Sequence, residues 1–188
     1  MTNIAAVVLA AGSSQRFGVE NKLLALVDGK PLLSHVLERI APLPLLASIV
    51  VVRPGDEAVM SLVGGHIADI VENDSAADGM GTSISAGVRH AGDVDGVMLV
   101  LGDMPLIKQS TYEELLAAFR DHPDKTIVAP TYKQRRGHPV LFRRTHFDDL
   151  MALDDDTGAK RILATNAATF LAVPTTDAGI LADIDGPV

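Results

Sequence analysis

Cysteine and tryptophan are both absent from this chain, and each absence excludes whole classes of chemistry. Without cysteine there can be no disulfide, thiolate metal site, iron–sulfur cluster or cysteine nucleophile. The only aromatic residues besides histidine are two tyrosines and five phenylalanines, which offer little surface for stacking nucleic-acid bases. A formal net charge of −8 also argues against general binding to nucleic acid or to an anionic membrane surface.

Long hydrophobic runs are missing as well. The longest apolar run near the N-terminus, Ile4 to Ala11, ends at Gly12, whereas a membrane-spanning helix needs about 20 residues. The preceding Met1-Thr2-Asn3 lacks the basic residues of a signal peptide. The sequence therefore predicts a soluble cytoplasmic protein.

The chain instead alternates short runs rich in Val and Ile with amphipathic helical stretches, over a length that suits one domain. Near-continuous hydrophobic strands imply a sheet covered on both faces, so we expect an α/β fold with a mostly parallel sheet. Strands are predicted at Ile4–Ala10, Ala47–Val52, Ala68–Val71, Gly96–Leu101, Thr126–Ala129, Pro139–Phe142, Phe170–Val173 and Leu181–Ile184. Helices are predicted after Pro31, taken as the first helical residue, and at Ser83–Ala91, Ser110–Arg120, His146–Met151 and Thr157–Ala167.

The first strand is followed by a loop that reads L-A-A-G-S-S-Q-R-F-G-V-E-N-K, from Leu9 to Lys22. Ligands of open α/β sheets bind at the carboxyl ends of the strands. Small residues at Ala10, Ala11 and Gly12 let backbone approach a ligand, and Arg16 and Lys22 bring two positive charges. The pattern indicates a phosphate-binding loop, although it is neither a Walker A motif nor G-x-G-x-x-G. The alternative is a glycine-rich turn whose charges are simply solvated.

Two later loops also place polar groups at strand or helix ends. Asp103 follows the strand Gly96–Leu101 in G-D-M-P-L, where a carboxylate is well placed to hold Mg²⁺ or, alternatively, to cap the next turn. Gly79, Gly81 and Ser83 precede or begin a helix, whose N-terminus is either an anion site or an ordinary cap.

The C-terminal part carries two further candidates. Arg135-Arg136-Gly137-His138-Pro139 concentrates charge before a strand, with His138 in a positioning role, whereas the arginines are either ligand contacts or solvated. Asp183 and Asp185 are predicted to lie on one face of the last strand, where they would complete a metal site with Asp103.

Taken in order, the first loop, G-D-M-P-L, G-H-P-V-L-F and D-I-D resemble the molybdenum-cofactor cytidylyltransferase family, within the molybdopterin nucleotidyltransferase group. The resemblance implies a single-domain, Rossmann-like three-layer sandwich of the nucleotide-diphospho-sugar transferase type. Residues 1–188 would form one nucleotidyltransferase domain, with 1–130 as the nucleotide-binding part and 131–188 as the acceptor-side part. One departure is Gly186, which replaces the threonine of the family's D-I-D-T segment.

The implied reaction is Mg²⁺-dependent transfer of CMP from CTP to the terminal phosphate of the molybdopterin cofactor, with release of pyrophosphate. The implied substrates are a nucleoside triphosphate and a pterin phosphate, and the implied protein partner is a molybdoenzyme or its chaperone. Ala11 stands where related guanylyltransferases have glycine, which favours cytidine by resemblance alone.

The resemblance also implies a role for each matching residue. The catalytic residues are Arg16, Lys22 and Asp103, and the metal ligands are Asp103 and Asp185. The acceptor-binding residues are Arg136, Gly137, His138 and Pro139. The nucleotide-binding residues are Leu9, Ala10, Ala11, Gly12, Ser13, Ser14, Arg16, Lys22, Gly79, Gly81, Ser83 and Asp103.

Three other functions stay open at this level. They are a guanylyltransferase with the same acceptor, a cytidylyltransferase for a small sugar or polyol phosphate, and a non-catalytic carrier of the pterin cofactor. The G-H-P-V-L-F segment argues against the sugar substrate, and a carrier would not need Arg16, Lys22 and Asp103 together.

Overall fold

Eight strands form the main sheet of the computed structural model, which describes residues 2–12, 21–66 and 68–184. Across the sheet the order is β10-β7-β9-β6-β1-β4-β5, and β8 pairs with β7. Strand β9 is antiparallel to both of its neighbours, β7 and β6, and β8 is antiparallel to β7. All other neighbouring pairs in this order are parallel. The strands are β1 (Ile4–Leu9), β4 (Ala47–Val52), β5 (Asp69–Glu72), β6 (Gly96–Leu101), β7 (Ile127–Tyr132), β8 (Arg135–Arg136), β9 (Val140–Arg143) and β10 (Phe170–Pro174).

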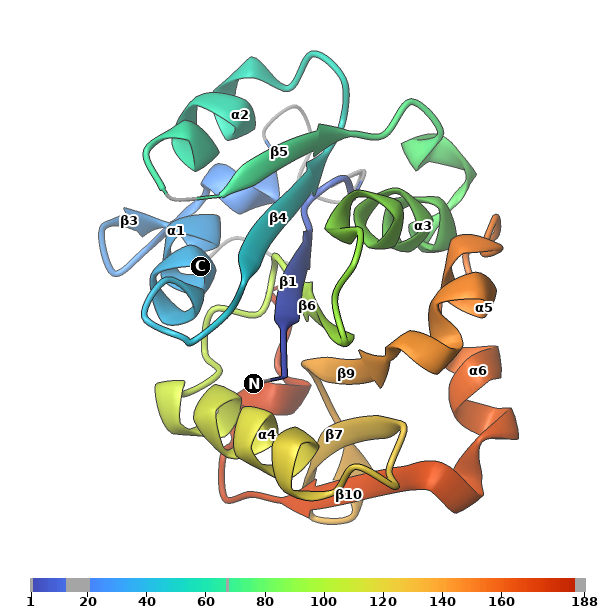
Figure 1. The fold of residues 1–188 in the computed structure, drawn as a ribbon. Coiled ribbons are helices and arrows are strands. Elements are labelled where there is room, and N and C mark those ends of the chain that lie inside the picture. The colour runs from blue at the N-terminus through green and yellow to red at the C-terminus, as the bar shows by residue number, and fades with distance from the viewer. Residues whose placement is uncertain (1, 13–20, 67, 185–188) are drawn as a thin grey trace.

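Helices cover both faces of this sheet, which makes three layers (Figure 1). On one face lie α1 (Leu32–Ile40), α2 (Glu57–Gly64) and α4 (Gln109–Asp121). On the other lie α3 (Met80–Ala91), α5 (Phe147–Met151) and α6 (Lys160–Thr165). The fold is thus the single-domain α/β architecture with a mostly parallel sheet that the sequence predicts.

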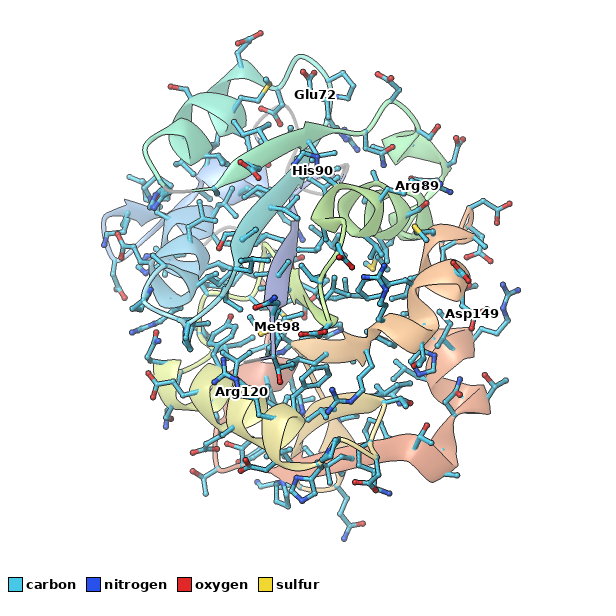
Figure 2. The ribbon with its side chains drawn as sticks, viewed as in Figure 1. Glu72, Arg89, His90, Met98, Arg120 and Asp149 are labelled. Atoms are coloured by element: carbon cyan, nitrogen blue, oxygen red, sulfur yellow. The ribbon has the colours of Figure 1, made fainter. Side chains whose placement is uncertain are left out.

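The alternation of side chains along β1 shows why a continuous apolar run builds this arrangement. Ile4, Ala6 and Val8 pack in the core beneath α1, α2 and α4, whereas Ala5 and Val7 pack beneath α3 and α5. All five are buried, and so is Met98 on the adjacent β6, in the interior of the molecule (Figure 2).

The chain leaves β1 in one direction to form β4 and β5 and then returns to form β6 on the other side of β1. This reversal is the topological switch point, where the two crossovers diverge and leave room for a ligand at the carboxyl edge. The first loop and the G-D-M-P-L loop both begin at that edge, after β1 and β6.

Several predictions about individual elements are wrong. No strand forms at Leu181–Ile184: a 3-10 helix, η6 (Ala178–Leu181), is followed by irregular chain, so Asp183 is not on a strand. Pro31 precedes α1 as its N-cap, with ψ near 137°, and pairs in the short hairpin of β2 (Leu26–Val27) and β3 (Lys30–Pro31). The short helix α2 and strand β8 were not predicted.

Candidate active site at the carboxyl edge of the sheet

The centre of the candidate site is an ion pair between Lys22 and Asp103. The Nζ atom of Lys22 lies 2.7 Å from Oδ2 of Asp103, and the two side chains are only 15% and 21% exposed. Lys22 begins η2 (Lys22–Leu24), which Asn21 caps by accepting the Leu23 N–H at 3.0 Å. A charge-assisted bond of this length fixes both groups in one place at the switch point.

Close backbone packing sets the position of Asp103. The N–H of Gly102 donates to the carbonyl of Leu9 at 3.0 Å, and a Cβ at Gly102 would lie 2.9 Å from that same oxygen. Gly102 therefore lets the ends of β1 and β6 meet directly. On the other side, the N–H of Ile184 donates to the Asp103 carbonyl at 3.1 Å.

The described part of the first loop lies immediately beside this pair. Ala10 and Ala11 are buried, Leu9 is partly buried and Gly12 is exposed, with open space where a Cβ would stand. Ser13, Ser14 and Arg16 lie outside the described residues, and so does the predicted metal ligand Asp185.

Arg53 is a further candidate, which lies outside the motifs of the sequence. It follows β4, next to β1, and its Nε donates to the carbonyl of Ala11 at 2.9 Å. Within residues 2–12, 21–66 and 68–184 it makes no ion pair, so its charge stands beside the first loop without an acidic partner. The signal available in the sequence was a lone basic residue directly after a buried strand.

The start of α3 forms the next part of the edge. Gly79 precedes α3 with φ of 130°, and Gly81 donates its N–H to the carbonyl of Asp155 at 2.8 Å. Side chains at these glycines would collide with the backbone at Asp155–Asp156. Ser83 is buried and its hydroxyl accepts from Asn73 Nδ2 at 3.0 Å, so it acts inside the protein as part of the support for α3.

The G-H-P segment lies on the other side of Asp103. Gly137 and Pro139 are buried and Arg136 is exposed on β8, where its guanidinium lies 5.9 Å from the ring of Phe170. The His138–Pro139 peptide is cis, and the His138 N–H donates to the carbonyl of Ile180 at 3.0 Å.

His138 carries the most perturbed imidazole of the site. Burial lowers the pKa of His138 to about 4, the Asp103 carboxylate opposes this shift, and Arg136 adds to it. The ring is therefore neutral at pH 7. Its Nδ1 is buried and has no hydrogen-bond partner in the part of the chain that the structure describes.

The donor set suits a cation that is shared with a ligand. Asp103 is a hard oxygen donor, but no cluster of three or more His, Cys, Asp or Glu that could hold a metal occurs within the described ranges. Mg²⁺ commonly binds through one or two carboxylates together with substrate phosphates. The residues present therefore fit a magnesium ion that arrives with a phosphate ligand.

Residues 6–170 match the MobA-like NTP transferase domain. The chain belongs to this family. The described residues also contain no helix long and apolar enough to cross a membrane.

Two curated relatives of this MobA-like chain are longer proteins. This chain is 33% identical over 177 residues to the bifunctional protein GlmU of Leifsonia xyli subsp. xyli. The aligned part makes up 90% of this chain and 36% of GlmU. This chain is also 33% identical over 141 residues to 3-deoxy-manno-octulosonate cytidylyltransferase of Pelobacter propionicus. The aligned part makes up 74% of this chain and 53% of that protein. The chain thus spans about a third to a half of these relatives.

Solved structures of the same fold extend over almost the whole chain. A homologue of Mycobacterium tuberculosis Rv0371c from Mycobacterium sp. strain JC1 is 28% identical with a TM-score of 0.76, over 97% of this chain and 90% of that one. Rv0371c itself, in complex with manganese, is 26% identical with a TM-score of 0.69, and the match covers 93% of this chain and 90% of Rv0371c. Molybdopterin-guanine dinucleotide biosynthesis protein A of Archaeoglobus fulgidus, 19% identical with a TM-score of 0.69 over 97% and 93%, shares the fold.

Proposed function

We propose that this protein is a divalent-metal-dependent nucleotidyltransferase that joins CMP from CTP to the terminal phosphate of a molybdenum-bearing pterin. The observation that carries the proposal is the Lys22–Asp103 pair at the switch point, which places a cation for phosphates beside a carboxylate for a metal. Membership of the MobA-like NTP transferase domain family supports the reaction type. Cytidine and the pterin acceptor rest on the resemblance of the loop motifs, including Ala11.

The reaction balances without a general base. An oxygen of the acceptor phosphate bonds to the α-phosphorus of the nucleotide, and the bond from that phosphorus to the oxygen that bridges to the β-phosphate breaks. Pyrophosphate leaves with the electron pair. Because the attacking phosphate is already an anion, catalysis consists of positioning and charge neutralisation.

The side chains divide this work between them. Lys22 and Arg16 neutralise the nucleotide phosphates, and Arg53 adds a third cation beside the same loop. Asp103 and Asp185 would hold the metal, which would supply further neutralisation of the phosphate charge. Residues 1–130 bind the nucleotide in this scheme. Residues 131–188 face the acceptor, through Arg136, Gly137, His138 and Pro139, and a molybdoenzyme or its chaperone receives the product.

A cytidylyltransferase with a different acceptor is the second candidate. It is favoured by the 33% identity to 3-deoxy-manno-octulosonate cytidylyltransferase over three quarters of this chain. The nucleotide half of the scheme is unchanged in this case. A sugar that attacks the α-phosphorus through a hydroxyl also loses that proton, which passes to a base or to water.

One experiment separates these possibilities. Pyrophosphate release is measured with Mg²⁺ and each of CTP, GTP, ATP and UTP, with the pterin phosphate, 3-deoxy-manno-octulosonate or no acceptor. We expect release only with CTP and the pterin phosphate. Selectivity for GTP would replace cytidine by guanine, and release with the sugar would select the second candidate. No release with any pair, beside an active control enzyme, would reject catalysis and favour a pterin carrier.

A further inference from the structure

Asp177 is the one aspartate or glutamate that is buried within residues 2–12, 21–66 and 68–184, with 3% of its surface exposed. A buried carboxylate is costly unless hydrogen bonds compensate it. Three donors do so here. The Lys108 N–H and the Thr111 hydroxyl each lie 2.8 Å from Oδ2, and the Gly179 N–H lies 2.9 Å from Oδ1.

Two of these donors belong to the N-terminus of α4, where unpaired N–H groups and the helix dipole favour a negative charge. The third belongs to the turn that follows β10. Asp177 therefore joins the segment after β10 to the helix that follows the G-D-M-P-L loop, and these elements are far apart in sequence.

The residues from Asp177 to Ile184, which we term the return segment, lie against the G-D-M-P-L loop and the G-H-P segment of the candidate site. Gly179 packs so closely on the loop after β6 that a Cβ would lie 2.3 Å from the carbonyl oxygen of Leu106. The Ile180 carbonyl accepts the His138 N–H at 3.0 Å, and the Ile184 N–H donates to the Asp103 carbonyl at 3.1 Å.

Helix capping alone does not explain this arrangement. Asp56 caps α2 by accepting the Val59 N–H at 3.3 Å and also accepts from Asn21 Nδ2 at 2.6 Å, but it does so while partly exposed. The Asp177 carboxylate is instead buried, and the segment that it anchors ends in a hydrogen bond from the Ile184 N–H to the Asp103 carbonyl.

We propose that Asp177 is a positioning residue for nucleotidyl transfer, which anchors the return segment so that the backbone at Asp103 and His138 is held in place. This inference rests on the proposed function. Asp177 acts through Ile180 and Ile184, and its carboxylate takes no part in bond making or breaking.

The first test needs no substrate. Asp177→Asn keeps the size of the side chain but turns an NH₂ group toward backbone and hydroxyl donors. The imidazole signals of His138, identified in NMR spectra by their loss in His138→Gln, are compared between wild type and Asp177→Asn. We expect them to shift, together with faster amide exchange across the return segment. Unchanged His138 signals and unchanged exchange would overturn the proposal.

The second test is kinetic. We expect Asp177→Asn to lower kcat by about 10- to 100-fold, as misplacement of reacting groups does, while KM for the nucleotide stays nearly constant. Thr111→Val removes only one of the three donors and should give a smaller effect in the same direction, which keeps the test informative if Asp177→Asn folds poorly. A folded Asp177→Asn with normal kcat would count against positioning.

A matched control excludes general loss of stability. Thr126 lies before β7, at the opposite edge of the sheet, and its hydroxyl donates to Thr169 Oγ1 at 2.7 Å. Thr126→Val should lower the Tm without changing kcat or the His138 signals. If the wild type releases no pyrophosphate with any substrate pair, the proposed function is wrong, but the role of Asp177 is still tested. The His138 signals then decide whether Asp177 holds the backbone at His138 in place.

Discussion

Lys22 and Asp103 are 81 positions apart in the sequence, yet Nζ of one lies 2.7 Å from Oδ2 of the other. The pair forms because η2 and the loop after β6 both lie at the switch point of the sheet. In this ion pair a cation suited to phosphate and a carboxylate suited to a metal neutralise each other. A nucleotide and a metal that arrive together would satisfy both.

Removing the Asp103 charge should abolish most turnover. We expect Asp103→Asn to lower kcat/KM by about 10²- to 10³-fold, the usual loss when a preorganised electrostatic group is removed. Glu38→Gln is the matched control, because Glu38 forms an ion pair of the same 2.7 Å length with Lys30 on the exposed surface. Steady-state kinetics of the two variants check this, and equal rates for both would contradict the role of Asp103.

Metal binding should depend on the nucleotide. Because Lys22 holds one oxygen of Asp103, Mn²⁺ alone should bind weakly, and CTP should tighten its binding by roughly 5- to 150-fold, the usual range of coupling between two ligands. Titration calorimetry with Mn²⁺, with and without CTP, measures this. Equally tight binding of Mn²⁺ without nucleotide would show a preformed metal site. A chelator should stop turnover, and added Mg²⁺ should restore it.

Stability should fall as the pH drops from 7 toward 5, and His138 should contribute to the fall. Its pKa is about 4 in the folded protein and near 6.5 when the chain is unfolded, so between these values the unfolded state binds more protons. The contribution is fully present above pH 6.5 and is lost as the pH falls toward 4, by up to about 3 kcal/mol, of which about 2 kcal/mol is lost between pH 7 and 5. Urea unfolding at pH 7, 6 and 5 measures it.

His138→Gln is the control for this pH dependence, because glutamine does not titrate in that range. The free energy of unfolding of this variant should change less between pH 7 and 5 than that of the wild type. Burial also lowers the pKa of His146, so part of the pH dependence should persist in His138→Gln and become smaller when His146 is replaced as well. An identical slope in wild type and His138→Gln would refute the assignment.

Gly137 should not tolerate a side chain. A Cβ at this position would lie 2.2 Å from the carbonyl oxygen of Ile180, which is backbone and cannot move aside cheaply. We expect Gly137→Ala to lower the free energy of unfolding by about 1–3 kcal/mol, as overpacking does. Gly64→Ala, in a helix with open space at that position, should raise it by up to about 1 kcal/mol. Urea unfolding of both variants decides the matter.

The elements that were predicted best are those that local sequence specifies alone. Ala47–Val52 and Gly96–Leu101 form strands with the predicted bounds, because continuous β-branched and apolar runs suit a sheet buried on both faces. The β7–β8 hairpin escaped prediction because Lys133 and Gln134 adopt positive φ in its turn without the Gly or Asn that signals such a turn. Leu181–Ile184 reads as a strand, but the ties of Asp177 and Gly179 hold that segment against the loop after β6.

The sequence by itself determined the α/β class, the order of most elements and the loops that carry Lys22, Asp103 and His138, because these depend on local pattern and on residue type. Only the tertiary structure brought out Asp177, placed Arg53 against the Ala11 carbonyl, and showed that Nδ1 of His138 is buried without a hydrogen-bond partner among the described residues. Each of these depends on groups that are distant in sequence: Asp177 meets donors 66 and 69 positions away. Burial and charge pairing across such distances are properties of the packed chain, and no local pattern encodes them.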